Sequence, residues 1–228
     1  MPTNARIRLL IASALAAALL LAGRSSLADG GRIGRLGSAD RARLEAGRIV
    51  LRPIVRRSGE RKLFGGASWQ VIDRPVEEVW AALLDVEHYD QMLPEVRRVQ
   101  VVARDGVRRV VRIEHGNALI HVGYHVQLEL RREHRELLFR LDRSRPSDLQ
   151  AAWGFIRLRP WGSWRTLVSF GAMADVGSGL VSGALRPLVH EWMLKVPWTL
   201  KKYLERGRGL ARYRIGTARQ STGTRPPL

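Results

Sequence analysis

Apolar and polar residues alternate over most of the middle of the chain, which is the pattern of β-strands with one buried face. Short turn-forming stretches interrupt the alternation. The pair Asp105-Gly106 is typical of a hairpin, and Asn117 predicts another turn. We therefore expect six or seven strands in an antiparallel meander. The runs with this pattern are 63–73, 96–115 (two strands), 119–133, 135–143, 150–160 and 163–175.

Residues 73–94 predict two short helices in succession. Apolar side chains recur three or four positions apart from Val76 to Leu84, which is one face of a helix. Asp73 is a candidate N-cap for it, and Pro75 suits its first turn. A second short helix, closed by a proline, is expected over Tyr89–Pro94.

The segment from Gly177 predicts one long amphipathic helix of about 25 residues, because its apolar residues are spaced three or four apart. Pro187 and Pro197 each remove a backbone hydrogen bond, so we expect the helix to be kinked or broken. An antiparallel sheet must cover its apolar face, and this helix is the long amphipathic element available. We expect the sheet to curl around it, with the two short helices filling one end of the gap.

The N-terminus has the three-part pattern of a secretory signal peptide. Arg6 and Arg8 precede the apolar run Leu9–Ala22, and small residues follow at Ser26 and Ala28. The run is shorter than the ~20 apolar residues needed to cross a bilayer, although an uncleaved N-terminal anchor stays open. The chain has no cysteine, and export without disulfides favours a bacterial periplasm.

The chain is strongly basic, with a formal net charge of +18, of which +15 lies outside residues 1–28. Such an excess attracts polyanions and anionic membrane surfaces. The arginines are spread along the sequence, never more than two in a row. We therefore expect no nucleic-acid partner and keep an anionic membrane surface as a candidate partner.

Residues 68–106 (SWQVIDRPVEEVWAALLDVEHYDQMLPEVRRVQVVARDG) resemble the START-like, or helix-grip, superfamily of polyketide cyclases/dehydrases and lipid-transport proteins. The nearest resemblance is to its coenzyme Q-binding branch. The matching features are a strand, a D-x-P-x-E-x-V-W helix start, a Y-x-x-M-L-P corner and a strand ending at Asp-Gly. The resemblance extends over about residues 65–205 and implies an α+β fold in which a curved antiparallel sheet encloses a hydrophobic cavity.

With this resemblance, the chain divides into four expected segments. Residues 1–28 are a signal peptide and 29–62 an N-terminal extension with a short helix and an edge strand. Residues 63–206 form the START-like domain, and 207–228 a flexible basic tail.

The resemblance implies a cavity for a lipid, quinone or polyketide-like molecule, and large apolar side chains are candidates to line it. A solidly packed core is the alternative interpretation of the same residues. His115 follows Ile113 and Val111 by two and four positions, so all three lie on the same face of the expected strand. We therefore expect His115 to point inward and to orient a ligand. The candidate ligand-binding residues are Trp80, Tyr89, Met92, Leu93, Tyr124, Phe139, Trp153, Trp192 and His115.

Three functional hypotheses stay open. The first is an exported, non-enzymatic protein that binds a hydrophobic small molecule. The second is a cyclase/aromatase-type enzyme with His115 or Tyr124 as its acid–base residue. The third is a protein-interaction module, and the predicted signal peptide argues against it. We expect no cofactor and no metal site, because His121 and His125 lie four positions apart on what is expected to be the solvent face of a strand. His190 is interpreted as structural.

Overall fold

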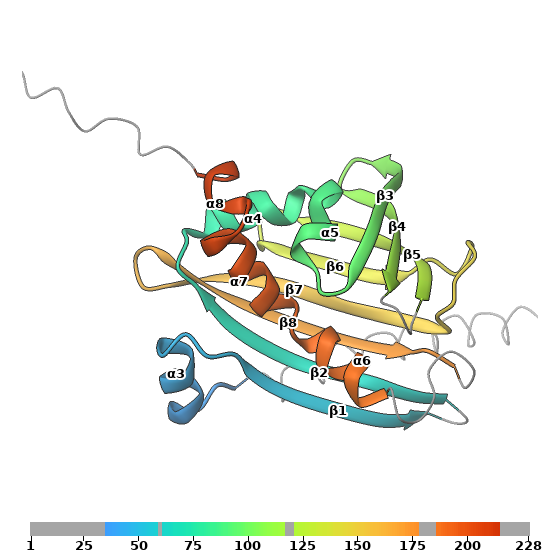
Figure 1. Ribbon diagram of the computed structural model, residues 1–228, viewed down its shortest axis with the longest axis horizontal. Coiled ribbons are helices and arrows are strands. Elements are labelled where there is room, and N and C mark those ends of the chain that lie inside the picture. The colour runs from blue at the N-terminus through green and yellow to red at the C-terminus, as the bar shows by residue number, and fades with distance from the viewer. Residues whose placement is uncertain (1–34, 59–60, 117–120, 178–185, 215–228) are drawn as a thin grey trace, which may run out of the picture. The chain divides into compact units, whose positions relative to one another are not determined.

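All strands pair in one antiparallel sheet (Figure 1). The computed structural model describes residues 35–58, 61–116, 121–177 and 186–214, and the described residues from Asp40 onward belong to one unit. The strand order is β1-β2-β8-β7-β6-β5-β4-β3. The strands are β1 (Val50–Ser58), β2 (Arg61–Ile72), β3 (Val96–Asp105), β4 (Arg108–Gly116), β5 (His121–Arg131), β6 (Glu136–Leu141), β7 (Ala151–Trp161) and β8 (Arg165–Asp175).

The sheet has eight strands rather than six or seven. The eighth strand is β1, the edge strand expected in the N-terminal extension: it pairs with β2 from Val50↔Trp69 to Ser58↔Arg61 and forms one edge of the sheet. The hairpin predicted at Asp105-Gly106 is confirmed: it joins β3 to β4, and Gly106 has a positive φ of 52°. The turn predicted at Asn117 lies outside the described residues.

Helices occupy the connections and the C-terminal part of the described chain. Their bounds are α3 (Ser38–Glu45), α4 (Val76–Leu84), the 3₁₀ helix η1 (Val86–His88), α5 (Tyr89–Met92), α6 (Arg186–Leu194), α7 (Val196–Arg206) and α8 (Gly209–Arg212). No helix in the described part of the chain has the length and apolar character needed to span a bilayer.

The two short helices predicted between the first strands are confirmed as α4 and α5. Val79 and Leu83 on α4 are buried, and α5 ends at Met92, two residues before Pro94. The prediction that Asp73 caps α4 is wrong. The N-cap is Pro75, and no side chain caps it. Asp73 instead lies 3.4 Å from the ammonium of Lys201 on α7.

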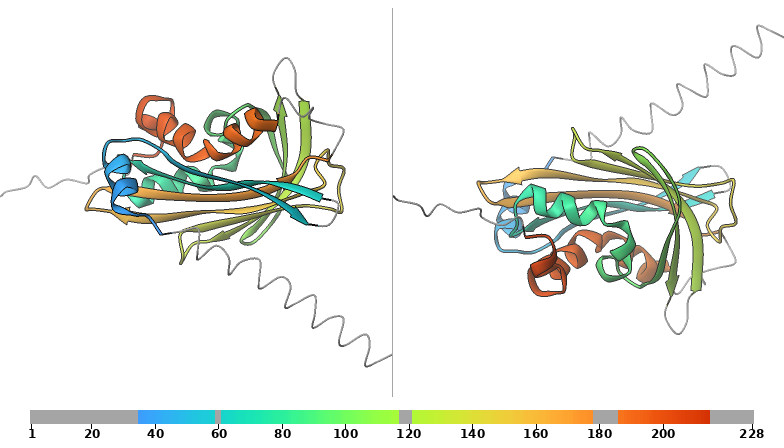
Figure 2. Two further views of the ribbon diagram at one scale, coloured as in Figure 1. Left: turned by 90° about the horizontal axis from the view of Figure 1, so that it is seen from below. Right: turned by 90° about the horizontal axis from the view of Figure 1, so that it is seen from above.

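The predicted break in the C-terminal helix is confirmed at Pro197. Helix α6 ends at Leu194, and α7 begins at Val196 with the proline in its first turn, where no backbone N–H is needed. Both helices lie against one face of the sheet (Figures 1 and 2). In Figure 2, β3–β5 turn out of the plane of the other strands toward the side occupied by these helices. The break lets the two helices change direction above the curved sheet.

The hydrophobic core lies between the inner face of the sheet and the helices. It joins Val79 and Trp80 on α4, Leu200 and Leu204 on α7, and inward residues of the strands such as Val168. Full burial of each such side chain contributes roughly 1.5–3 kcal/mol. This core fills the end of the gap near α4 and α7, and the remaining space lies toward α6.

The expected loose tail does not begin at Gly207. Helix α8 follows α7, and Tyr213 is buried. The Tyr213 hydroxyl donates to Asp85 Oδ2 at 2.8 Å, and Arg212 Nε donates to the same carboxylate at 3.0 Å. Residues 209–213 are therefore attached to the connection between α4 and η1.

Candidate functional site

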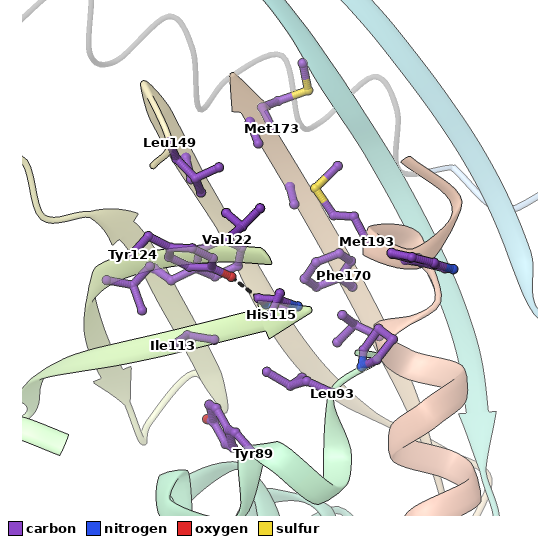
Figure 3. Close-up of a pocket in the computed structure, with 18 of the residues that line it drawn as sticks. Tyr89, Leu93, Ile113, His115, Val122, Tyr124, Leu149, Phe170, Met173 and Met193 are labelled. Carbon is purple, nitrogen blue, oxygen red and sulfur yellow. Dashed lines mark hydrogen bonds between the residues drawn. The ribbon is translucent and has the colours of Figure 1, made fainter. Parts of the chain in front are cut away.

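A cavity of about 200 Å³ lies between the sheet and the C-terminal helices (Figure 3). Its wall comes from the inner residues of β2 and β4–β8, from α5 and the residues after it, and from α6 and the start of α7. Aliphatic and aromatic side chains make up nearly all of it. Its main lining residues are Phe64, Tyr89, Leu93, Ile113, His115, Val122, Tyr124, Leu137, Phe139, Ile156, Phe170, Ala172, Ala174, Trp192, Met193 and Val196.

Small residues on β7 and β8 make room for the cavity. Gly154 pairs with Phe139 across β6 and β7, and the Phe139 ring lies over it: a Cβ at Gly154 would meet the ring at 2.4 Å and the Gly171 carbonyl oxygen at 2.2 Å. Phe139 then stacks on Phe170, with ring centroids 6.1 Å apart. Ala172 lines the sheet side of the cavity between these rings and α6, and its short side chain leaves space above the sheet.

His115 and Tyr124 form the polar feature of this wall. They lie on neighbouring strands, β4 and β5, and the Tyr124 hydroxyl is 2.7 Å from His115 Nε2 (Figure 3). The two rings stack with an interplanar angle of 11°. His115 also makes a hydrogen bond with the backbone of Pro94, which can only accept. Since Nε2 faces the hydroxyl, Nδ1 is the nitrogen left to donate, and Tyr124 donates its proton to Nε2.

Burial keeps this pair neutral. It lowers the pKa of His115 from 6.5 to about 4, against a smaller upward effect of the Pro94 hydrogen bond. Burial likewise raises the pKa of Tyr124 above its usual value. Near neutral pH the cavity therefore holds a neutral imidazole and a neutral phenol. They can orient one ligand oxygen without placing a charge in the apolar interior.

Tyr89 contributes its ring rather than its hydroxyl. The hydroxyl donates to the Leu83 carbonyl at 2.6 Å, and burial raises its pKa. A carbonyl at the end of α4 thus satisfies the phenol.

The nine candidate residues separate into three groups. Six line the cavity: Tyr89, Leu93, His115, Tyr124, Phe139 and Trp192. Trp80 and Met92 are buried in the core beside it, at 8% and 1% exposure. Trp153 was expected to line the same space, but its neighbours Ala152 and Ile156 do so, and the alternation of β7 points Trp153 to the other face of the sheet.

Several lining residues were missed by the sequence analysis, chiefly Phe64, Phe170 and Met193. A usable pattern was present for Phe170, because it alternates in step with the buried Val168 and Ala172 on β8. The sequence contains no comparable signal for the small residues that line the cavity. An alanine leaves space because its side chain is short, and the sequence alone does not show whether another side chain fills that space.

His125 does not lie on a solvent face, contrary to expectation. It is 8% exposed, and its Nδ1 is 2.9 Å from the Pro146 carbonyl oxygen, because the loop after β6 covers this part of β5. His121 is exposed, as expected. His190 contacts the Gly65 carbonyl and the Phe64 ring, a structural role as expected. Among the described residues, no group of acidic or histidine side chains could hold a metal ion.

The chain belongs to the family described as polyketide cyclase / dehydrase and lipid transport, whose profile matches residues 72–196. A comparison with curated proteins finds no match. Among solved structures, a protein of Thermus thermophilus is similar, with 26% identity and a TM-score of 0.55 over 65% of this chain and 98% of that one.

Two further solved structures are similar at lower identity. One is the Zhui aromatase/cyclase of Streptomyces sp. R1128, with 16% identity and a TM-score of 0.54 over 73% of this chain and 98% of that one. The other is a START superfamily protein of Mycobacterium smegmatis, with 15% identity and a TM-score of 0.51 over 62% of this chain and 97% of that one. These likenesses confirm the α+β, START-like fold expected from residues 68–106.

Proposed function

We propose that this protein binds a hydrophobic small molecule, a lipid, quinone or polyketide-like compound, in the cavity between the sheet and α6–α7, and that it does so without catalysing a reaction. The observation that carries the proposal is an apolar cavity whose polar groups already have partners. Tyr124 donates to His115, and the Tyr89 hydroxyl donates to a backbone carbonyl. Membership of a family named for both cyclases and lipid transport is consistent with such a ligand.

The size of the cavity limits what fits inside it. At about 30 Å³ for each water-sized group, about 200 Å³ holds roughly seven such groups. This suits a short acyl segment or one small ring system, and it lies below the ~300–1,000 Å³ typical of drug-sized ligands. Burying about 200 Å² of apolar ligand surface contributes about 5 kcal/mol before association costs are subtracted.

A quinone is one candidate of the right chemistry. Its ring would lie against Phe170, and one carbonyl oxygen would accept a hydrogen bond from Tyr124, which would turn away from His115. Loss of affinity in Tyr124→Phe for a short-chain benzoquinone, but not for the corresponding hydrocarbon, is the expected result. Equal losses for both ligands would argue against a quinone.

Binding can be tested with the neutral dye N-phenyl-1-naphthylamine, whose fluorescence rises in apolar surroundings, and by mass spectrometry of solvent extracts of the purified protein. The dye is larger than the cavity, so we expect one of its ring systems to enter and the rest to extend past Leu93. Binding should be saturable and 1:1, and Ala172→Phe should abolish it, because the phenylalanine ring would occupy the cavity. The control is Ala103→Phe at an exposed position of β3. Equal dye binding by both variants would contradict the proposal.

The alternative function is that of a cyclase/aromatase-type enzyme in the same cavity, and the His115–Tyr124 hydrogen bond is the observation that favours it. A neutral imidazole inside the cavity could accept a proton from a substrate carbon, with Tyr124 donating to the adjacent carbonyl oxygen. In that case His115→Gln would abolish turnover of a poly-β-ketone thioester analogue while retaining its binding. Absence of turnover by the unaltered protein would favour the binding role.

Export to a bacterial periplasm is part of the proposal. It is supported by the basic start, the apolar run Leu9–Ala22 and the small residues that follow. N-terminal sequencing of the protein recovered from a periplasmic fraction should begin at or near Asp29. Recovery of the intact N-terminus from a membrane fraction would indicate an anchor instead.

Contact with an anionic membrane surface is proposed as the route by which ligand enters. The net charge favours it, as do the exposed Trp198 and the neighbouring Lys202 on α7. Cosedimentation with phosphatidylglycerol vesicles, weakened by salt and absent with phosphatidylcholine, is the expected result.

A further inference from the structure

A second concave site runs along the seam between α5 and α7, next to the apolar cavity. It is a groove of about 440 Å³. Its walls come from α5 and the residue after it, from one side of α7, and from the turn before α8. The residues that line it are Gln91, Leu93, Thr199, Lys202, Tyr203, Arg206, Gly207 and Arg208.

The groove and the cavity are adjacent, because Leu93 lines both. The side of α7 also continues from one to the other. Val196 lines the cavity, and Thr199, Lys202 and Arg206 follow it three, six and ten positions later, which keeps them on one helical face. A molecule that reached from the apolar cavity onto this face would have to pass Leu93, the residue common to both sites.

The groove is positively charged and has no carboxylate among its described lining residues. Lys201, on the neighbouring side of α7, is paired with Glu205 at 2.6 Å. No described carboxylate forms an ion pair with Lys202, Arg206 or Arg208. The Lys202 ammonium lies 4.5 Å from the centroid of the Trp198 ring, which holds it beside the groove without neutralising it.

We infer that the ligand is an amphiphile with an anionic head, a carboxylate or phosphate, which binds in this groove while its apolar part fills the cavity. This inference rests on the proposed function. It follows from the positions of the two sites: a cavity for about seven carbon-sized groups shares Leu93 with a groove in which three cations lie on one concave surface. Charge-assisted hydrogen bonds from Lys202, Arg206 and Arg208 would hold the head and give the affinity that so small a cavity cannot supply alone.

Decanoate and decanol are the probes, because they share a chain and differ in the charge of the head. Each is used to displace N-phenyl-1-naphthylamine at about pH 8, where the carboxylate is ionised. The test variant is K202Q/R206Q/R208Q. The matched control is R132Q/R143Q/R159Q, which removes three exposed arginines that line neither site.

We expect decanoate to bind about tenfold or more tightly than decanol, and this preference to disappear in K202Q/R206Q/R208Q but not in the control variant. Raising the salt concentration should weaken decanoate binding and leave decanol unchanged. Decyl phosphate should behave as decanoate does, and inorganic phosphate should compete with decanoate but not with the dye.

Three results would overturn the inference. Equal affinities of decanoate and decanol, with normal dye binding, would remove the head-group site and leave the proposed function intact. Unchanged decanoate affinity in K202Q/R206Q/R208Q, together with lost binding to phosphatidylglycerol vesicles, would assign the groove to a membrane surface. Absence of dye, decanol and decanoate binding alike would refute the proposed function itself.

Discussion

Replacing Ala172 with leucine tests whether the interior between the sheet and α6–α7 holds free volume. Ala172 lies on β8, is 5% exposed and lines the cavity. Leucine adds three carbon atoms. If each occupies about 30 Å³, as a water molecule does, the larger side chain fills under half of the space of about 200 Å³.

An interior with free volume and an interior filled by side chains predict opposite signs for the change in unfolding free energy that Ala172→Leu causes. Three methylene-sized groups buried in free space contribute about 2.4 kcal/mol, from which roughly 0.5–1 kcal/mol is subtracted for the ordered side chain. Ala172→Leu should then stabilise the protein by about 1–2 kcal/mol. In a filled interior the same change would cost about 1–3 kcal/mol through overpacking.

Urea denaturation of both proteins, followed by circular dichroism, measures this difference. Ala82→Leu is the matched control, because Ala82 is fully buried on α4 and does not line the cavity. It should lose about 1–3 kcal/mol. The reasoning fails if Ala172→Leu loses stability as Ala82→Leu does with an unchanged dependence on urea, since the cavity would then be occupied by side chains.

Three further predictions follow from burial, titration and the attachment of α8. Trp80→Ala should cost about 3–5 kcal/mol in unfolding free energy while the folded protein keeps its dye affinity, because Trp80 packs in the core and not on the cavity wall; equal stability with lost dye binding would contradict this. The unfolded state binds a proton at His115 below about pH 6.5 and the folded state only below about pH 4, so stability should fall by up to about 3 kcal/mol as pH drops through that window, and His115→Gln should lack this fall in urea titrations across pH. Burial raises the pKa of Asp85, but hydrogen bonds from His88, Tyr213 and Arg212 outweigh it and hold that pKa below its usual value; Asp85→Ala should therefore speed amide hydrogen exchange in residues 209–213 and leave β7 and β8 protected.

Local patterns were sufficient to predict much of the fold. The helical face of Val79 and Leu83, the proline after α5 and the Asp105-Gly106 hairpin each depend on neighbours within a few residues, and the structure contains all three. The broken C-terminal helix followed equally directly from Pro197, since proline has no N–H to give the previous turn.

The cavity wall was harder to predict because it depends on contacts between distant segments. Trp153 is large and apolar, which favoured an inward position, yet the register of β7 places Gly154 inward, beneath Phe139. His125 had polar neighbours typical of a solvent face, but residues after β6 cover it. Composition indicates how apolar a residue is, whereas strand register and a covering loop decide which side it occupies.

The two glycines on the paired strands β7 and β8 affect how sequence comparisons of this family should be interpreted. Any side chain at Gly154 would collide with the Gly171 carbonyl, and one at Gly171 would collide with the Phe155 ring, 2.5 Å from its Cβ. Relatives that keep this pairing of β7 with β8 should therefore retain glycine at the Gly154 position whatever compound they carry, and at the Gly171 position where they also keep a ring at the Phe155 position. Invariance at the Gly154 position would reflect the close approach of two backbones, and differences in ligand choice should be sought at the alanines that lie on the same strands.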